Sequence, residues 1–118
     1  MSKLTADDRL DIQELMARYS RAIDFGKVMG SHKGREAVKT FGTMLAGAGL
    51  TMRHYVTNVM IEGEGDHATA TTYVLAFTGP KGGSLTPTTG RYEDELRKVD
   101  GRWLLHVRRG VIEMGGPS

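Results

Sequence analysis

The chain has 118 residues, 39% of them hydrophobic and 25% charged, which favours one soluble globular domain over a disordered chain. It contains no cysteine, which excludes a disulfide framework, an iron–sulfur site and a cysteine nucleophile. The net charge is only +2, without the dense basic stripe of a nucleic-acid-binding surface, so no nucleic acid is expected as a partner. No apolar run is long enough for a membrane span or a signal peptide, so a cytoplasmic protein without membrane contact is expected.

The first predicted element is a helix over residues 5–25. Apolar residues at helical spacing form one stripe along it, which comprises Ile12, Leu15, Met16, Tyr19, Ala22 and Ile23. Thr5 is the predicted N-cap, and Asp7 and Asp8 lie in the first turn, where the helix dipole favours negative charge. Gly26 is predicted to end the helix, because glycine accepts the left-handed conformation found there.

A loop and a second helix are predicted next. Residues 26–34 contain three glycines and show no apolar period, which is typical of a loop. From Arg35 to Ala48 apolar residues return at helical spacing, and Gly47 and Gly49 end this helix.

After Gly49 the apolar period changes to two, which indicates strands. Four are predicted, at residues 51–62, 67–78, 89–99 and 102–112, and Asp100-Gly101 is a tight hairpin signal between the last two. The alternation places Met52, His54, Val56, Asn58 and Met60 on one face of the first strand, and Arg53, Tyr55, Thr57, Val59 and Ile61 on the other. Two helices followed by a four-strand antiparallel meander predict an α+β fold.

Four stretches carry a resemblance to a known family. They are residues 4–24, 34–41, 53–58 and 90–108, and in this order they resemble SnoaL-like proteins of the nuclear transport factor 2-like superfamily. The resemblance implies a single domain over residues 1–118, with N-terminal helices packed into a cone-shaped, curved antiparallel sheet. It also implies that a small hydrophobic ligand binds inside the cone.

The chain departs from the family pattern at one place. Only nine residues, 25–33, stand where family members have a further short helix and the first barrel strand. The sheet is therefore expected to lack one usual helix and strand, which leaves an unguarded edge. A homodimer is expected to complete the wall, and exchange of the first helix between copies is one way to do so.

The resemblance implies that Asp24 and His54 are catalytic. A histidine both takes and gives a proton near neutral pH, and a carboxylate bonded to one ring nitrogen fixes its tautomer. Two structural readings compete with this one. Asp24 also suits an arginine neighbour such as Arg21 or Arg53, and His54 also suits a half-buried strand position.

Five further residues are predicted to bind substrate: Tyr19, Tyr55, Asn58, Tyr73 and Arg91. Tyr73 and also Tyr92 offer hydroxyls to a ligand oxygen, although strand and helix tyrosines are commonly core residues. Arg91 offers a charge to an anionic or enolate oxygen, or pairs with a glutamate at the surface. The third strand lacks the histidine that the dehydratase branch of the family has there, which argues against that branch.

No metal and no cofactor are expected. His32, His54, His67 and His106 have no short-range spacing typical of metal ligands. The hypothesis is a cofactor-independent acid/base isomerase, cyclase or dehydratase acting on a small apolar or aromatic substrate. The alternative is a non-catalytic ligand-binding or dimeric assembly module of the same fold.

Overall fold

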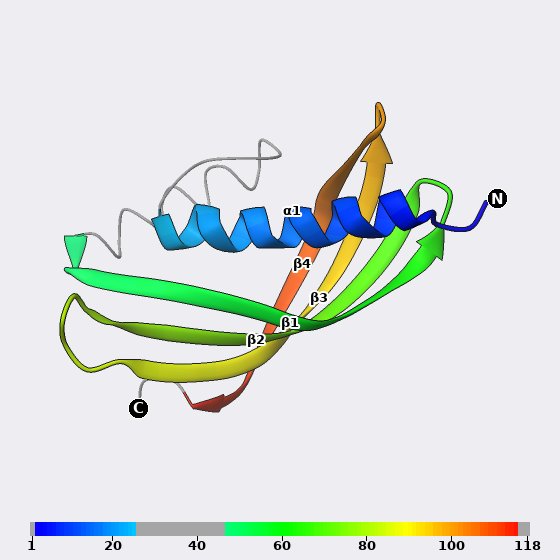
Figure 1. Cartoon of the computed structure of the whole chain (residues 1–118). Helices are drawn as coiled ribbons and strands as arrows, with labels where there is room; N and C mark the ends of the chain where they lie inside the picture. The colour runs from blue at the N-terminus through cyan, green and yellow to red at the C-terminus, as the bar shows by residue number, and fades with distance from the viewer. Residues whose placement is uncertain (1, 26–46, 116–118) are drawn as a thin grey trace.

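The computed structural model describes residues 2–25 and 47–115, which form one helix and a four-stranded antiparallel sheet. The elements are α1 (Ala6–Phe25), β1 (Leu50–Glu64), β2 (His67–Pro80), β3 (Thr86–Val99) and β4 (Arg102–Gly115). The strands are ordered β1-β2-β3-β4 in a curved sheet that does not close, and α1 lies across its concave face (Figure 1). The predicted α+β fold is confirmed.

Part of the predicted N-terminal half cannot be compared with the structure. Three predicted features lie outside the described residues: the end of the first helix at Gly26, the loop at residues 26–34, and the second helix up to residue 46. Within the described residues, no helix is long and apolar enough to cross a membrane.

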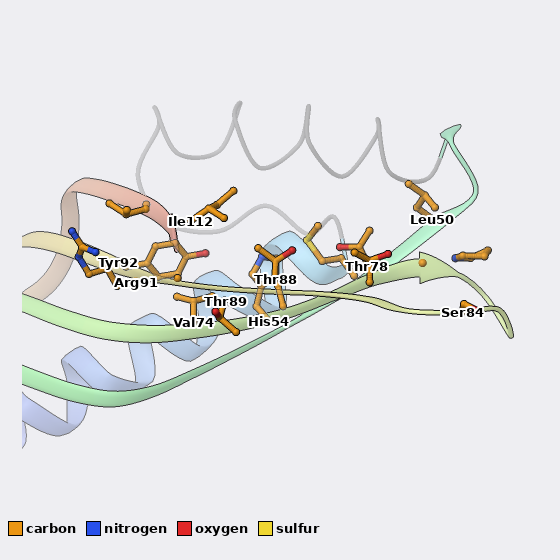
Figure 2. Close-up of a pocket in the computed structure, with 18 residues that line it drawn as sticks. Leu50, His54, Val74, Thr78, Ser84, Thr88, Thr89, Arg91, Tyr92 and Ile112 are labelled. Carbon is orange, nitrogen blue, oxygen red and sulfur yellow. The ribbon is translucent and has the colours of Figure 1, made fainter. Parts of the chain in front are cut away.

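The hydrophobic core lies between the first part of α1 and one half of the sheet. Ile12 and Met16 of α1 are almost completely buried, and they pack with Leu4, Ile61, Ala68, Ala70, Leu96 and Trp103. Ala68 and Ala70 are the members of this core that β2 contributes. The other half of the concave face, beyond this core, borders the hollow drawn in Figure 2.

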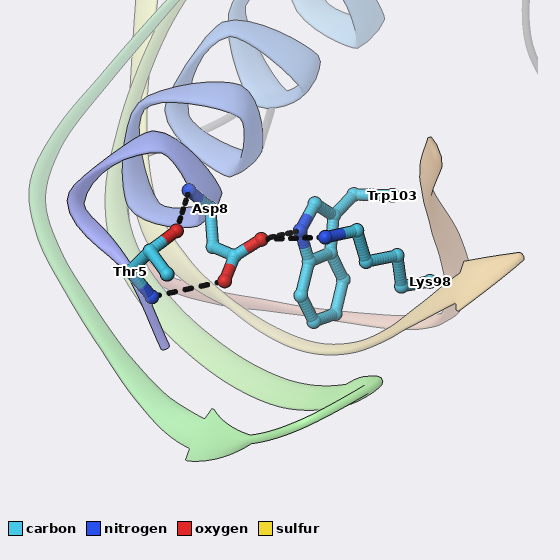
Figure 3. Close-up of polar contacts among 4 residues, drawn as sticks. All are labelled: Thr5, Asp8, Lys98 and Trp103. Atoms are coloured by element: carbon cyan, nitrogen blue, oxygen red, sulfur yellow. Dashed lines mark hydrogen bonds and ion pairs between the residues drawn. The ribbon is translucent and has the colours of Figure 1, made fainter. Parts of the chain in front are cut away.

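A capping box begins α1 and confirms Thr5 as the N-cap. The Asp8 backbone N–H donates to Thr5 Oγ1 at 3.0 Å, and the Thr5 N–H donates to Asp8 Oδ2 at 2.9 Å. Lys98 Nζ and Trp103 Nε1 both donate to Asp8 Oδ1 at 3.0 Å (Figure 3). Asp8 therefore ties the start of the helix to the β3–β4 hairpin.

These donors hold the pKa of Asp8 well below its ordinary value, with the Thr5 backbone N–H the largest cause and Trp103 and Lys98 next. A lowered pKa in the folded state stabilises the fold above the ordinary value of 3.8, and this stabilisation is lost as the pH falls below it. Asp8→Asn is therefore expected to lower the melting temperature at pH 7 by roughly 5 °C. The melting temperature of this variant should also decrease less between pH 4 and pH 2 than that of the wild type.

Thermal unfolding at pH 7, 4 and 2.5, followed by fluorescence of the single tryptophan, measures this effect. Asp7→Asn is the matched control, because Asp7 lies in the same helical turn but is exposed. An equal loss of stability for Asp8→Asn at all three pH values would contradict the lowered pKa of Asp8 in the folded protein.

A bulge in β1 changes which side chains share a face. Thr57 pairs with Tyr73 and Met60 with Thr71, so β1 holds one extra residue there, and Asn58 adopts φ 53°. The predicted alternation is therefore wrong beyond Thr57. Val59 and Ile61 pack into the core on the side of His54, whereas Met60 is 64% exposed.

The hairpin prediction is confirmed, and all four strands are longer than predicted. Asp100 and Gly101 have φ values of 51° and 77°, as a tight two-residue turn requires. β3 begins at Thr86 rather than residue 89, and β4 continues to Gly115 rather than residue 112. Thr88 pairs with Gly115 in these extensions, and Thr86 and Thr88 line the hollow.

Candidate functional site

The last turn of α1 brings Asp24 against His54 on β1. Asp24 Oδ1 lies 2.6 Å from His54 Nδ1, and Asp24 Oδ2 accepts the His54 backbone N–H at 2.9 Å. The two side chains are only 5% and 10% exposed, respectively. One carboxylate therefore holds both the backbone and the ring of His54. The Asp24 carboxylate lies near the C-terminus of α1, where the helix dipole disfavours a negative charge, and the contact with His54 compensates this effect.

The contact defines the proton arrangement of the imidazole. A carboxylate is an acceptor only, so Nδ1 carries the hydrogen of the 2.6 Å contact. In the neutral ring, Nε2 is then the basic nitrogen. His54 lines a cavity, and the described residues offer Nε2 no hydrogen-bond partner. The geometry thus suits a proton acceptor facing a ligand.

The cavity has a volume of about 730 Å³ and lies over the concave face of all four strands (Figure 2). This volume is in the range of small-molecule sites. Its described wall is mainly apolar with several hydroxyls, and includes Met52, His54, Val74, Ala76, Thr78, Thr88, Tyr92, Val111 and Ile112. A smaller hollow of about 350 Å³ lies between α1 and β1 and is bordered by both Asp24 and His54.

A second polar cluster stands on β3 and β4. Arg108 donates from Nε to Asp94 Oδ1 and from Nη2 to Asp94 Oδ2, each at 2.9 Å, and the Asp94 side chain is fully buried. The Arg108 guanidinium lies 3.9 Å from the centre of the Tyr92 ring. Burial raises the pKa of Tyr92, with Arg108 opposing and Asp94 and Asp24 adding to the rise. The Tyr92 phenol therefore stays protonated at neutral pH.

Asp94 and Arg108 are not among the site residues predicted from the sequence. The sequence signal for this ion pair was an acidic and a basic residue on two strands that a tight hairpin joins. Their pairing depends on a bulge between Glu95 and Leu96, which the sequence pattern does not reveal.

Three of the predicted substrate-binding residues lie away from the large cavity. Tyr73 is 59% exposed on the convex face, and Asn58 is exposed in the β1 bulge. Tyr55 is 56% exposed, packs edge-to-face with Phe77, and borders only the smaller hollow. These three residues are therefore not among the proposed ligand contacts.

The other two predicted substrate-binding residues have partners within the protein. Tyr19 is buried in α1, and its ring centre lies 5.7 Å from the Arg108 guanidinium. Arg91 borders the large cavity, but its guanidinium lies 3.3 Å from Glu113 and 3.9 Å from Glu93. Both positions agree with the structural alternatives, in which Tyr19 is core and Arg91 is a partner for glutamate.

No metal site is evident in residues 2–25 and 47–115. These ranges contain no group of three or more histidine, aspartate or glutamate side chains that could hold an ion. His67 and His106 are exposed and lie apart from His54 in the sheet register.

A helix laid across a curved, open sheet, with a hollow at one end of the concave face, defines a cone-shaped α+β fold. Residues 22–109 match the family described as SnoaL-like domain, and the chain belongs to this family. The predicted resemblance is therefore confirmed. No curated protein sequence matches the chain significantly.

Solved structures show the same fold. A protein of unknown function with a cystatin-like fold from Nostoc punctiforme is 26% identical, with 94% of this chain and 95% of that chain covered and a TM-score of 0.69. A candidate scytalone dehydratase from Novosphingobium aromaticivorans is 22% identical, with 93% and 87% covered and a TM-score of 0.74. LinA is 20% identical, with 95% and 90% covered and a TM-score of 0.76. The last two likenesses establish fold alone.

Proposed function

We propose that this protein is a cofactor-independent acid/base enzyme, an isomerase, cyclase or dehydratase, that acts in the cytoplasm on a small apolar or aromatic molecule. The observation that carries the proposal is the Asp24–His54 pair, in which His54 lines a largely apolar cavity. Membership of the SnoaL-like family and the likeness to a candidate scytalone dehydratase support it.

The proposed reaction begins with proton abstraction from a carbon next to a carbonyl. His54 Nε2 takes the proton, and the electron pair of the broken C–H bond forms a C=C bond as the carbonyl oxygen becomes an enolate. Asp24 stabilises the imidazolium so formed. Return of the proton to another carbon gives an isomer, and its transfer to a departing hydroxyl gives dehydration.

Exchange of α-protons for deuterium tests this step without knowledge of the natural substrate. A panel of neutral bicyclic aryl ketones is incubated with the protein in D2O at neutral pH and followed by proton NMR. We expect the wild type to accelerate exchange for at least one ketone. A wild type no faster than a His54→Gln variant across the panel would contradict the proposal.

The alternative is a ligand-binding module of the same fold without chemistry. It is favoured by the third strand, where the described β3 has no histidine and Arg91 is paired with glutamates. The same experiment separates the two functions, because this alternative expects ketone binding without exchange.

We also propose that the protein forms a homodimer. Among the described strands, β1 and β4 are the sheet edges, and Tyr55 and Tyr73 expose aromatic surface on the convex face. Light scattering at micromolar concentration is expected to give twice the chain mass of 12.9 kDa. A mass of one chain at that concentration would contradict the dimer.

A further inference from the structure

The structure points to a role for Tyr92 that rests on the proposed function. We propose that the Tyr92 hydroxyl donates a hydrogen bond to the carbonyl oxygen of an uncharged ligand, while His54 takes a proton from the neighbouring carbon. Tyr92 lines the same cavity as His54, and its hydroxyl extends along the cavity on the side of His54 (Figure 2). The described residues offer the phenol oxygen no hydrogen-bond partner.

The strand register places the two groups at a separation that suits a small ligand. His54 pairs with Ala76, Ala76 pairs with Thr88, and Tyr92 lies four residues further along β3 on the same face. Ideal sheet geometry gives about 17 Å between the Cα atoms of His54 and Tyr92. Both side chains line the same cavity, and its volume of about 730 Å³ has room for one small molecule.

The neighbours of Tyr92 hold its ring in place before any ligand binds. The Arg108 guanidinium stacks on the ring, and Asp94 fixes Arg108 with two hydrogen bonds. Gly110 lies opposite Tyr92 on β4, and a Cβ atom there would meet the ring at 3.4 Å. A donor fixed in this way loses little freedom on binding, which is the requirement for stabilising a developing oxyanion.

The charges around the cavity favour an uncharged ligand. Asp94 neutralises Arg108, and Glu113 and Glu93 neutralise Arg91, so the described wall presents no unpaired cation to a carboxylate or phosphate. A protonated phenol is suited to a carbonyl oxygen instead. In the proposed step its proton stays on Tyr92, and the hydrogen bond strengthens as negative charge develops on the ligand oxygen.

Tyr92→Phe tests the role, because it removes one oxygen and keeps the ring on Arg108. Tyr73→Phe is the matched control, because Tyr73 is on the neighbouring strand but projects from the convex face. The probes are 2-acetylnaphthalene, naphthalene without the carbonyl, and 2-naphthoate with a negative charge. Affinities are measured by calorimetry, and α-proton exchange of the ketone by NMR in D2O.

We expect the wild type to bind 2-acetylnaphthalene more tightly than naphthalene or 2-naphthoate. Tyr92→Phe should weaken ketone binding about fivefold, the effect of one hydrogen bond, and leave naphthalene binding unchanged. It should slow exchange of the bound ketone about 100-fold, as loss of an oxyanion donor does. Tyr73→Phe should match the wild type in every measurement.

Unchanged ketone affinity and exchange in a folded Tyr92→Phe variant would overturn the proposal, as would ketone binding no tighter than naphthalene binding. Preferred binding of 2-naphthoate would overturn the inference of an uncharged ligand. The proposed function fails separately: if the wild type catalyses no exchange but binds the ketone in a Tyr92-dependent way, the ligand contact stands and only the acid/base chemistry is lost.

Discussion

Replacement of His54 by glutamine is expected to lower the rate of ketone α-proton exchange at least about 100-fold, the contribution typical of a positioned general base. Glutamine retains a polar group of similar size but has no basic nitrogen. The affinity for the ketone should change little, since the proposed polar contact to its oxygen comes from Tyr92. Exchange rates from NMR and dissociation constants from calorimetry separate these two effects.

Asp24→Asn tests the same site through its proton arrangement. An asparagine can still accept the His54 backbone N–H through its carbonyl, while its NH2 donates to Nδ1 in place of the carboxylate. The imidazole then carries its proton on Nε2 and cannot act as a base there. We expect a loss of exchange of about 100-fold with the fold intact.

His106→Gln is the control for both variants, because His106 is exposed on β4. It should exchange ketone protons at the wild-type rate. Full activity in His54→Gln or Asp24→Asn would show that the contact between α1 and β1 is structural only.

Asp94→Ala is expected to cause the largest loss of stability among the ion pairs described, about 3–5 kcal/mol in the free energy of unfolding. The Asp94 side chain is fully buried and that of Arg108 only 15% exposed. Removal of the carboxylate leaves the guanidinium buried with no opposite charge, and its Nη1 already lacks a partner among the described residues. Urea unfolding at neutral pH, followed by Trp103 fluorescence, measures the change.

Glu14→Ala provides the matched comparison. Glu14 lies 3.1 Å from Arg18 on α1, but the two side chains are 63% and 59% exposed, respectively. Water screens such a pair, so we expect a loss below about 0.5 kcal/mol. Equal losses for Glu14→Ala and Asp94→Ala would contradict the role of burial.

In a folded Asp94→Ala protein, slower ketone exchange is also expected, because Arg108 no longer holds Tyr92.

The fold could be predicted wherever local patterns are strong. The helical spacing of apolar residues predicts α1. The Asp100-Gly101 pair predicts the hairpin turn, because both residues adopt positive φ there. The β1 bulge could not be predicted, because Met60 and Ile61 are both apolar and satisfy either register of the strand. Only packing against α1 decides that Ile61 enters the core.

The candidate site depends on long-range contacts in the same way. Asp24 and His54 are thirty residues apart in sequence, and family resemblance rather than local pattern suggested the pair. Asp94, Arg108 and Tyr92 meet only because β3 and β4 adopt one register with a bulge between Glu95 and Leu96. A one-residue slip would move each strand's side chains to the opposite face of the sheet.

NMR of the protein with 15N-labelled histidine tests the central claim most directly, that Asp24 holds His54 so that Nε2 faces a ligand. We expect the His54 ring to carry its proton on Nδ1, and the Nε2 resonance to shift when 2-acetylnaphthalene is added. The resonances of His67 and His106 should stay unchanged. A His54 ring that carries its proton on Nε2, or that does not respond to the bound ketone, would contradict the account.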